Sequence, residues 1–357
     1  MSRATNIAAN FWLLNKELDS ADFAMVMSTG IVSTALQLLG HESGARILFH
    51  ANIVLFVILW ALYLLKFFRY PQKSLEEFSG HLTGPGFLTL VAGTNILGSQ
   101  FVLFERNFLL AQCLFWLGAV CWIFMIWGIF YCIFTSENKP ALASGINGAW
   151  LLATVSTQSI VILGVDIAGA AGWDRQWSDF LFCALFCLGI MLYIFVITVI
   201  FYRFCFAKMT AQDMTPTYWI NAGGVAISTL AGASLLLHQG EGALLDSCLP
   251  FIRGMTLLAW ASASWWMPML FLLWIWRHLL KGCSLAYDPA YWGMVFPLGM
   301  YCACTATLAD ALDFEGITLI SRIIMAFALP AWLATFAGML LSTGKRLAAG
   351  MVKAQGL

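Results

Sequence analysis

The sequence predicts a polytopic membrane protein built from α-helices, and two observations carry that prediction. Of the 357 residues, 61% are hydrophobic and only 10% are charged, with a mean hydropathy of +0.84. No soluble fold could hide so much apolar surface. The apolar residues also form ten continuous stretches of 18 to 24 residues, and about 20 helical residues cross a bilayer core. A transmembrane β-barrel would show short alternating strands instead.

The ten stretches alternate in composition along the chain. The odd-numbered stretches contain 34 Gly, Ser, Thr, Asn and Gln among 92 residues, whereas the even-numbered ones contain 13 among 108. Lipid accepts bulky apolar side chains and penalises unpaired polar groups, so the odd set should face inward and the even set should face lipid. The odd stretches are 23–40, 87–104, 147–164, 217–236 and 291–308, and the even stretches are 47–65, 108–131, 180–201, 254–276 and 323–342.

The first segment, residues 1–22, precedes the membrane stretches. Four charged residues between positions 16 and 22 exclude the apolar core of a signal peptide. Phe11, Trp12, Leu14 and Leu18 suggest a short helix lying on the membrane surface. An ordinary frayed terminus accounts for the same pattern equally well.

The stretches pair into five helical hairpins, each an inner helix followed by an outer one. Gly30 is followed seven residues later by Gln37, and Gly93 by Gln100 in the second hairpin. Repeated units in a membrane protein are usually arranged about a symmetry axis, so we expect a quasi-fivefold ring of inner helices around a central pore. Helix-interrupting glycines and Pro297 in the inner stretches fit a pore lining, although small residues also permit close helix packing.

The hairpins form one membrane domain, residues 23–344, followed by a tail, residues 345–357. The N-terminus, the loops after the even stretches and the C-terminus hold 13 Lys and Arg, and the opposite side holds five Arg. Cytoplasmic loops are enriched in basic residues. We therefore expect both termini in the cytoplasm and the protein in the inner (plasma) membrane.

The interior of the ten stretches contains no Asp, Glu, Lys or Arg. Coupled pumps usually keep an ionisable group at membrane depth, so its absence favours a passive, neutral pathway. Asp166, Glu105 and Asp310 lie close to the ends of inner stretches. Hydroxyl, amide and glycine positions of the inner stretches are the candidate lining, because weak neutral sites suit fast conduction. These candidates are Thr29, Gly30, Ser33, Thr94, Asn95, Thr154, Ser156, Asn221, Gly224 and Ser228.

The cysteine and histidine residues indicate neither a metal site nor a haem site. Eight of the ten cysteines lie in or beside apolar stretches, where buried free Cys is the usual state. The five histidines are scattered, and a haem needs a suitably placed pair. With no nucleophile–base pair either, we expect no enzyme activity, no cofactor and no nucleic-acid partner.

Three segments of the inner stretches carry a family resemblance: residues 25–33 (MVMSTGIVS), 213–221 (DMTPTYWIN) and 291–299 (YWGMVFPLG). With the ten stretches, residues 20–345 resemble the tellurite-resistance/dicarboxylate transporter family. This family includes bacterial TehA-like proteins, the plant slow anion channels and fungal malate and sulfite transporters. Nothing in the sequence itself is suited to reducing or chelating tellurite.

The resemblance implies a homotrimer in which each chain has its own pore. It also implies a phenylalanine on the ninth helix that closes the pore, and the matching residue is Phe296, directly before Pro297. An aromatic ring in a narrow pore blocks hydrated ions, and a proline permits a bend. A packed core phenylalanine is the alternative. The plant channels' long phosphorylated tails are absent from this sequence, so regulation by kinases is not implied.

The function expected from these features is a gated anion channel or uniporter. It would pass small inorganic anions or C4-dicarboxylates through a neutral pore in the lipid bilayer. A secondary transporter, such as a proton-coupled dicarboxylate, sulfite or tellurite-related carrier, is the main alternative.

Overall fold

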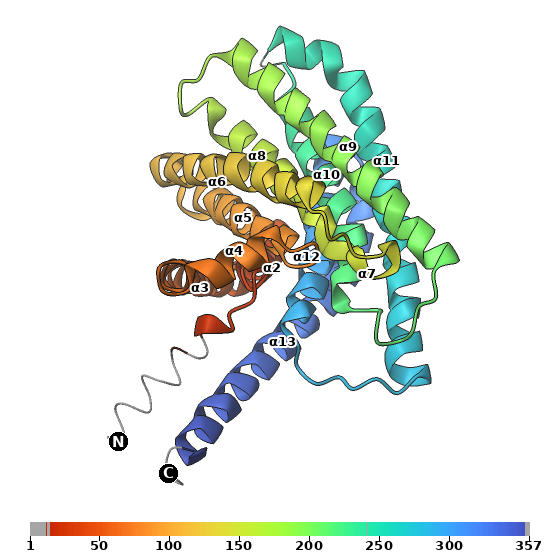
Figure 1. Ribbon diagram of the computed structural model, residues 1–357. Coiled ribbons are helices and arrows are strands. Elements are labelled where there is room, and N and C mark those ends of the chain that lie inside the picture. The colour runs from red at the N-terminus through yellow and green to blue at the C-terminus, as the bar shows by residue number, and fades with distance from the viewer. Residues whose placement is uncertain (1–11, 13–14, 241, 354–357) are drawn as a thin grey trace.

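The computed structural model describes residue 12, residues 15–240 and residues 242–353, and these form helices and loops without a β-strand (Figure 1). The inner helices are α2 (Ala24–Leu38), α5 (Leu88–Glu105), α8 (Leu152–Ala168), α10 (Ile220–Leu237) and α12 (Trp292–Ala311). The outer helices are α3 (Glu42–Arg69), α6 (Phe108–Thr135), α9 (Arg175–Phe206), α11 (Ala243–Ile275) and α13 (Thr318–Lys353). Two short helices, α4 (Pro71–Ser79) and α7 (Leu142–Gly145), lie in connections between hairpins.

The burial of the helices confirms the predicted alternation. In the most apolar window of each long helix, 72 to 94% of the residues of α5, α8, α10 and α12 are buried. The corresponding share for α3, α6, α9, α11 and α13 is 22 to 28%. In α2, 12 of the 15 residues are buried. The small and polar stretches therefore form the interior, and the aromatic stretches form its periphery.

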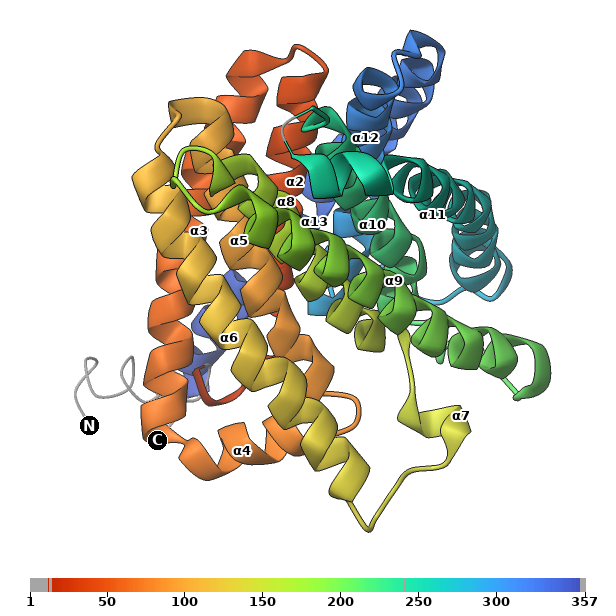
Figure 2. The same ribbon diagram turned by 90° about the horizontal axis from the view of Figure 1, so that it is seen from above.

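The inner helices close into a ring. Each contacts the next in the order α2, α5, α8, α10 and α12, and α12 returns to contact α2. Each outer helix contacts the inner helix that precedes it in its own hairpin. Figure 2 shows α3, α6, α9 and α11 around the periphery, with α2, α8, α10 and α12 between them. Hairpin topology makes all five inner helices run in the same direction.

The helices differ in length from the predicted stretches. Nine described helices, with their flanking turns, are long and apolar enough to cross a membrane, and the tenth, α2, has only 15 residues. The outer helices are longer than their apolar stretches, with 28 to 36 residues. Hydropathy detects only the part inside the hydrocarbon, whereas a helix continues through the interface with polar residues. For the same reason α8 extends beyond residue 164 and includes Asp166.

A short 3₁₀ turn precedes each of four inner helices. These turns are Gly84–Phe87, Gly148–Leu151, Pro216–Trp219 and Pro289–Tyr291. Successive turns contact one another, and we call them together the collar. At Gly148 the backbone lies so close to the Thr217 carbonyl that an added Cβ would overlap it. Buried Arg203 on α9 donates hydrogen bonds to the Ile146 carbonyl and to the Tyr218 hydroxyl. The collar thus holds the N-terminal ends of the inner helices together.

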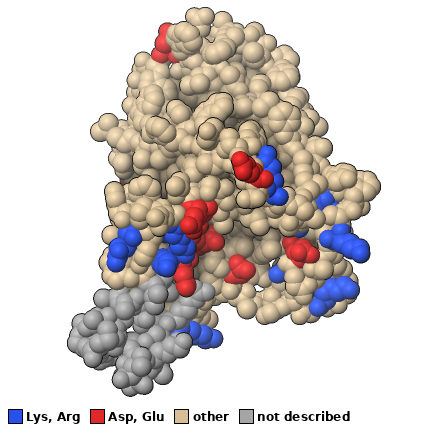
Figure 3. Space-filling view, in the orientation of Figure 1, with Lys and Arg blue, Asp and Glu red and all other residues tan. Residues whose placement is uncertain are grey.

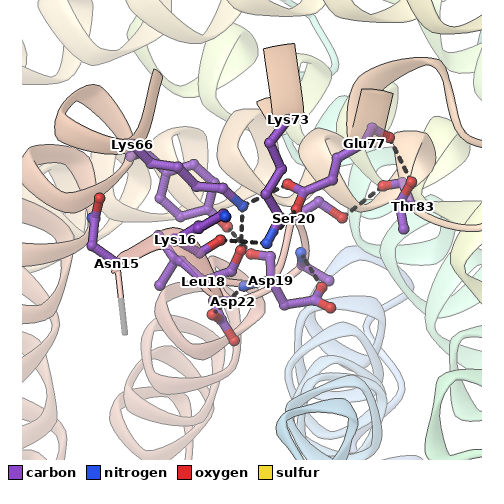
Figure 4. A network of polar contacts seen from close by, with 12 residues as sticks. Asn15, Lys16, Leu18, Asp19, Ser20, Asp22, Lys66, Lys73, Glu77 and Thr83 are labelled. Atoms are coloured by element: carbon purple, nitrogen blue, oxygen red, sulfur yellow. Dashed lines mark hydrogen bonds and ion pairs between the residues drawn. The ribbon is translucent and has the colours of Figure 1, made fainter. Parts of the chain in front are cut away.

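The segment before α2 is fixed by a polar network (Figure 4). The buried Lys66 ammonium on α3 donates to the Leu18 carbonyl and pairs with Glu77 of α4 at 2.5 Å. The Tyr63 hydroxyl donates to the Asp19 carbonyl at 2.6 Å, and Ser20 donates to the Thr83 carbonyl. Most of the interfacial helix predicted in residues 1–22 lies outside the described residues. Its described end is held against α3 and α4.

The charged residues follow the hairpin topology. The connections at the collar end, with both terminal segments, hold 13 Lys and Arg and eight Asp and Glu, and the opposite end holds five Arg and ten Asp and Glu. In the face shown in Figure 3, Lys and Arg lie in its middle and lower parts, and the uppermost part shows none. Opposite ends of the ring therefore carry net charges of opposite sign.

Candidate functional site

A cavity of about 270 Å³ opens between the C-terminal halves of the inner helices. All five inner helices contribute to its wall. The lining residues are Ile31, Thr34, Leu38, Ile96, Ser99, Leu103, Ser159, Ile162, Asp166, Leu230, Ser234, Leu237, Met300 and Thr307. Within each helix they are spaced by three, four or seven residues, which is the spacing of one helix face.

The lining residues form successive layers from the mouth inward. The last lining residues of four helices form the mouth ring, which consists of Leu38, Leu103, Asp166 and Leu237. One turn deeper lies the hydroxyl ring, formed by Thr34, Ser99, Ser234 and Thr307. The next layer is mainly apolar and includes Ile31, Ile96, Leu230 and Met300. The three leucines of the mouth ring are 37 to 49% exposed, whereas these four deeper residues are at most 8% exposed.

Phe296 lies one helical turn before the cavity-lining residue Met300 on α12. It precedes Met300 by four residues on α12 and therefore shares its helix face. Continuing the same faces on the other inner helices leads to Met27, Ala92, Val155 and Ala226. All five side chains are at most 1% exposed. These five buried apolar side chains continue the cavity-lining helix faces toward the collar.

The position of Phe296 depends on a glycine of the neighbouring helix. A Cβ added at Gly223 of α10 would lie 3.2 Å from Phe296 Cε1 and 2.9 Å from Pro297 Cγ. Cβ contacts below 3.0 Å force a shift. The aromatic ring and the proline therefore rest directly on the bare backbone of α10.

The candidate lining residues of α2 contact neighbouring helices and are not among the residues that line the cavity. Thr29 Oγ1 accepts a hydrogen bond from Trp332 Nε1 of α13 at 3.0 Å. The Ser33 hydroxyl donates to the Ala45 carbonyl of α3 at 2.7 Å. A Cβ added at Gly30 would meet Ile96 of α5 and Asn52 of α3. These three positions hold helices together.

The candidates of α5 and α8 are likewise outside the cavity wall. Thr94 and Ser156 donate to carbonyls of their own helices. Asn95 donates to the Ser159 hydroxyl at 3.0 Å and thereby joins α5 to α8. The Thr154 hydroxyl is buried, with no hydrogen-bond partner among the described residues.

On α10, the three candidates are also absent from the cavity lining. The Ser228 hydroxyl donates to the Gly224 carbonyl, and a Cβ added at Gly224 would meet the Tyr193 ring of α9 at 3.0 Å. The Asn221 side chain is fully buried, and its amide has no partner within the described part of the chain. None of the ten candidates is among the residues that line the cavity.

The lining residues that sequence reasoning missed share a detectable signal. They repeat at one-face spacing in the C-terminal half of every inner helix, and many are Leu or Ile. Composition emphasised polar residues, but inside a membrane protein such residues also serve interhelical hydrogen bonds. Within the described residues no group of three or more His, Cys, Asp and Glu is arranged to hold a metal ion.

Comparison with known proteins assigns this arrangement to a family. Residues 17–340 match the family described as voltage-dependent anion channel. The chain belongs to the voltage-dependent anion channel family. This family is made up of anion transporters and channels, and the match confirms the resemblance inferred from the three segments.

Two relatives match most of the chain. Both are proteins of Methanocaldococcus jannaschii that carry the name uncharacterized transporter, and each is 24% identical to this chain. The alignments span 307 and 302 residues, which are 84% and 82% of this chain and 87% and 84% of the relatives. A Mycobacterium tuberculosis protein named uncharacterized membrane protein is 32% identical over 150 residues, 42% of this chain and 75% of its own length.

Proposed function

We propose that the chain is a gated channel or uniporter for small anions, with its pathway along the axis of the inner-helix ring. Phe296, with Pro297 behind it, closes this pathway. The observation that carries the proposal is the position of Phe296: it is fully buried and continues the helix face of Met300 and Thr307, which line the cavity.

The electrostatics of the ring favour anions at the collar end. The N-terminus of a helix carries about half a positive charge, and five parallel inner helices present their N-termini to this end. The basic residues of the adjoining connections add to that potential. Both features attract anions without placing a fixed cation in the pathway.

The hydroxyl ring supplies the neutral donors that conduction requires. Among the described residues, the hydroxyls of Thr34, Ser99 and Ser234 have no hydrogen-bond partner, and each can turn toward the cavity. Hydroxyl groups replace part of an anion's hydration without binding it tightly, and weak sites permit fast passage.

The assembly and orientation belong to the same proposal. We place the collar, the tail of residues 345–357 and both termini in the cytoplasm, with the cavity mouth outside and the protein in the inner membrane. The ring is quasi-fivefold, and three chains assemble into a homotrimer. Native mass spectrometry from nanodiscs should then give three times the chain mass; a monomer at all detergent concentrations would contradict the trimer.

The decisive experiment replaces Phe296 with Ala and records anion currents in planar bilayers. Removing the ring should raise nitrate or chloride conductance at least tenfold, because about 1.4 kcal/mol of lost barrier corresponds to a factor of ten. Phe186→Ala is the matched control, since Phe186 is equally buried but lies on the outer helix α9. A silent Phe296→Ala protein that is correctly folded would refute the channel.

A proton-coupled carrier is the second candidate, and Asp166 is the observation that favours it. Coupled carriers keep an ionisable group beside the transport pathway, and Asp166 lines the cavity. In liposomes, uptake of malate or sulfite that requires a pH gradient, with the membrane potential clamped, would support the carrier. Flux that follows the anion's Nernst potential alone supports the channel.

A further inference from the structure

The mouth ring combines three leucines with one carboxylate. Asp166 is the single ionisable side chain among the residues that line the cavity. Leu38, Leu103 and Leu237 occupy the corresponding places on α2, α5 and α10. Any ion that passes between the outer solution and the hydroxyl ring must cross this layer, so the charge of Asp166 acts on every permeating ion.

The carboxylate of Asp166 lies beside a second titratable side chain, that of His238. No hydrogen bond or ion pair to it is found within the described residues. His238, which follows the end of α10, interacts with it electrostatically. The His238 Nδ1 atom is hydrogen-bonded to the Ser234 carbonyl at 2.9 Å. On the neighbouring surface Glu105 is already paired with Arg46 at 3.4 Å.

The surroundings of Asp166 add to its effect. The five inner helices end at this mouth, and helix C-termini carry about half a negative charge each. Apart from Asp166, the sequence at this end also has more acidic residues than arginines, nine against five. The mouth is therefore negative, in contrast to the collar end.

A negative mouth discriminates between anions by their valence. Coulomb energy is proportional to the product of the charges, so a fixed carboxylate repels a dianion twice as strongly as a monoanion. A monoanion then crosses at a modest cost, whereas a dianion meets a barrier that the neutral hydroxyls beneath do not offset.

We propose that Asp166 is a valence filter that restricts the pathway to small monovalent anions and excludes sulfate and C4-dicarboxylate dianions. The inference rests on the proposed channel function and specifies its substrate class. It assigns Asp166 to specificity and leaves closure to Phe296.

The test measures the permeability ratio of malate or sulfate to nitrate in the conducting Phe296→Ala background. Asp166→Asn should raise this ratio about tenfold, because it removes one charge and preserves the size of the side chain. Asp166→Glu should keep the ratio of the background. Leu103→Asn, at the same layer, controls for polarity without charge and should leave the ratio unchanged.

A second variant tests the valence filter even if the Asp166→Asn protein does not fold. Leu103→Asp adds a carboxylate to the mouth ring and should lower the ratio further. The Asp166→Asn comparison is repeated in a His238→Asn background, so that the charge of His238 does not affect the permeability ratio. An unchanged ratio in both charge variants would overturn the valence filter and leave the channel standing. Absence of anion current in Phe296→Ala would instead defeat the channel itself, and loss of proton-coupled uptake in Asp166→Asn would assign the residue to the carrier.

Discussion

At the scale of single residues, two adjacent glycines of α10 have different neighbours. Gly223 lies under Phe296 and Pro297, whereas Gly224 lies against the Tyr193 ring of α9. The same methyl group added at each position therefore meets either the proposed gate or an outer helix. This makes the pair a local probe of which contacts hold the pathway shut.

Gly223→Ala should raise the basal anion conductance, because the added methyl displaces the Phe296 ring from its resting place. Gly224→Ala should cost similar stability, about 1–3 kcal/mol for an overpacked interior, without changing conductance. Bilayer currents and thermal unfolding in detergent measure the two effects. Equal basal currents in both variants and in the unmodified protein would contradict the assignment of Phe296.

A second contrast at this scale concerns two lysines that share Glu77. The Lys66 side chain is 5% exposed and pairs at 2.5 Å, whereas the Lys73 side chain is 34% exposed and pairs at 3.6 Å. Lys66→Met should lower the free energy of unfolding by about 1–3 kcal/mol, because it leaves a partly buried carboxylate and a freed Leu18 carbonyl. Lys73→Met should change it by less than about 0.5 kcal/mol. If both variants lower the thermal unfolding midpoint equally, burial of the lysine does not determine how much its ion pair with Glu77 stabilises the protein.

At the scale of helices, three tryptophans of outer helices donate to threonine hydroxyls of inner helices. Trp122 donates to Thr157, Trp260 to Thr305 and Trp332 to Thr29, each at 3.0–3.1 Å. They connect α6 to α8, α11 to α12 and α13 to α2. Lipid provides no hydrophobic force between helices, so such bonds and close packing hold the layers together.

The Trp332–Thr29 bond should give a coupling free energy of about 0.6 kcal/mol, the average found for interhelical hydrogen bonds in membranes. A double-mutant cycle of Trp332→Phe and Thr29→Val measures it through unfolding in mixed detergent micelles. The cycle of Trp332→Phe with Thr157→Val combines residues that are not partners and should give none. Coupling of equal size in both cycles would mean that the measurement reports something other than this bond.

These bonds also show which features of the structure could be predicted from the sequence. The inner and outer sets were predictable because lipid exposure acts on the composition of an entire helix, as the aromatic outer helices show. The residues of the cavity wall were not predictable from composition, because Thr29 and Thr34 differ in role only through the face of α2 on which each lies. Their faces depend on which neighbour each helix meets. Phe296 was predicted through the family resemblance alone, and its role as the gate stays a prediction.

At the scale of the whole molecule, the ring has two electrically different ends. Net basic connections and helix N-termini mark the collar end, and net acidic connections and helix C-termini mark the cavity mouth. The basic end of a membrane protein usually remains in the cytoplasm. Orientation and the sign of the local potential therefore come from the same residues.

Cysteine labelling of intact cells tests this orientation. Glu315→Cys, in the connection between α12 and α13, should react with a membrane-impermeant maleimide, whereas Asn138→Cys, between α6 and α7, should react only after lysis. The unmodified protein, whose ten cysteines are all free, supplies the background to subtract. The reverse labelling pattern would invert the topology.

The network beneath the segment before α2 determines how the ring can move. Residues 18–20 are bonded to Lys66, Tyr63 and Thr83 and lead through a short turn into α2, which contacts α12. A piston movement of α2 along the pathway would have to break these bonds together. In the proposed channel α2 therefore stays in place. The pathway opens by a movement of α12, which bends at Pro297 or rotates about its own axis. In such an opening, Phe296 moves relative to α2, which α3 and the segment before α2 hold in place.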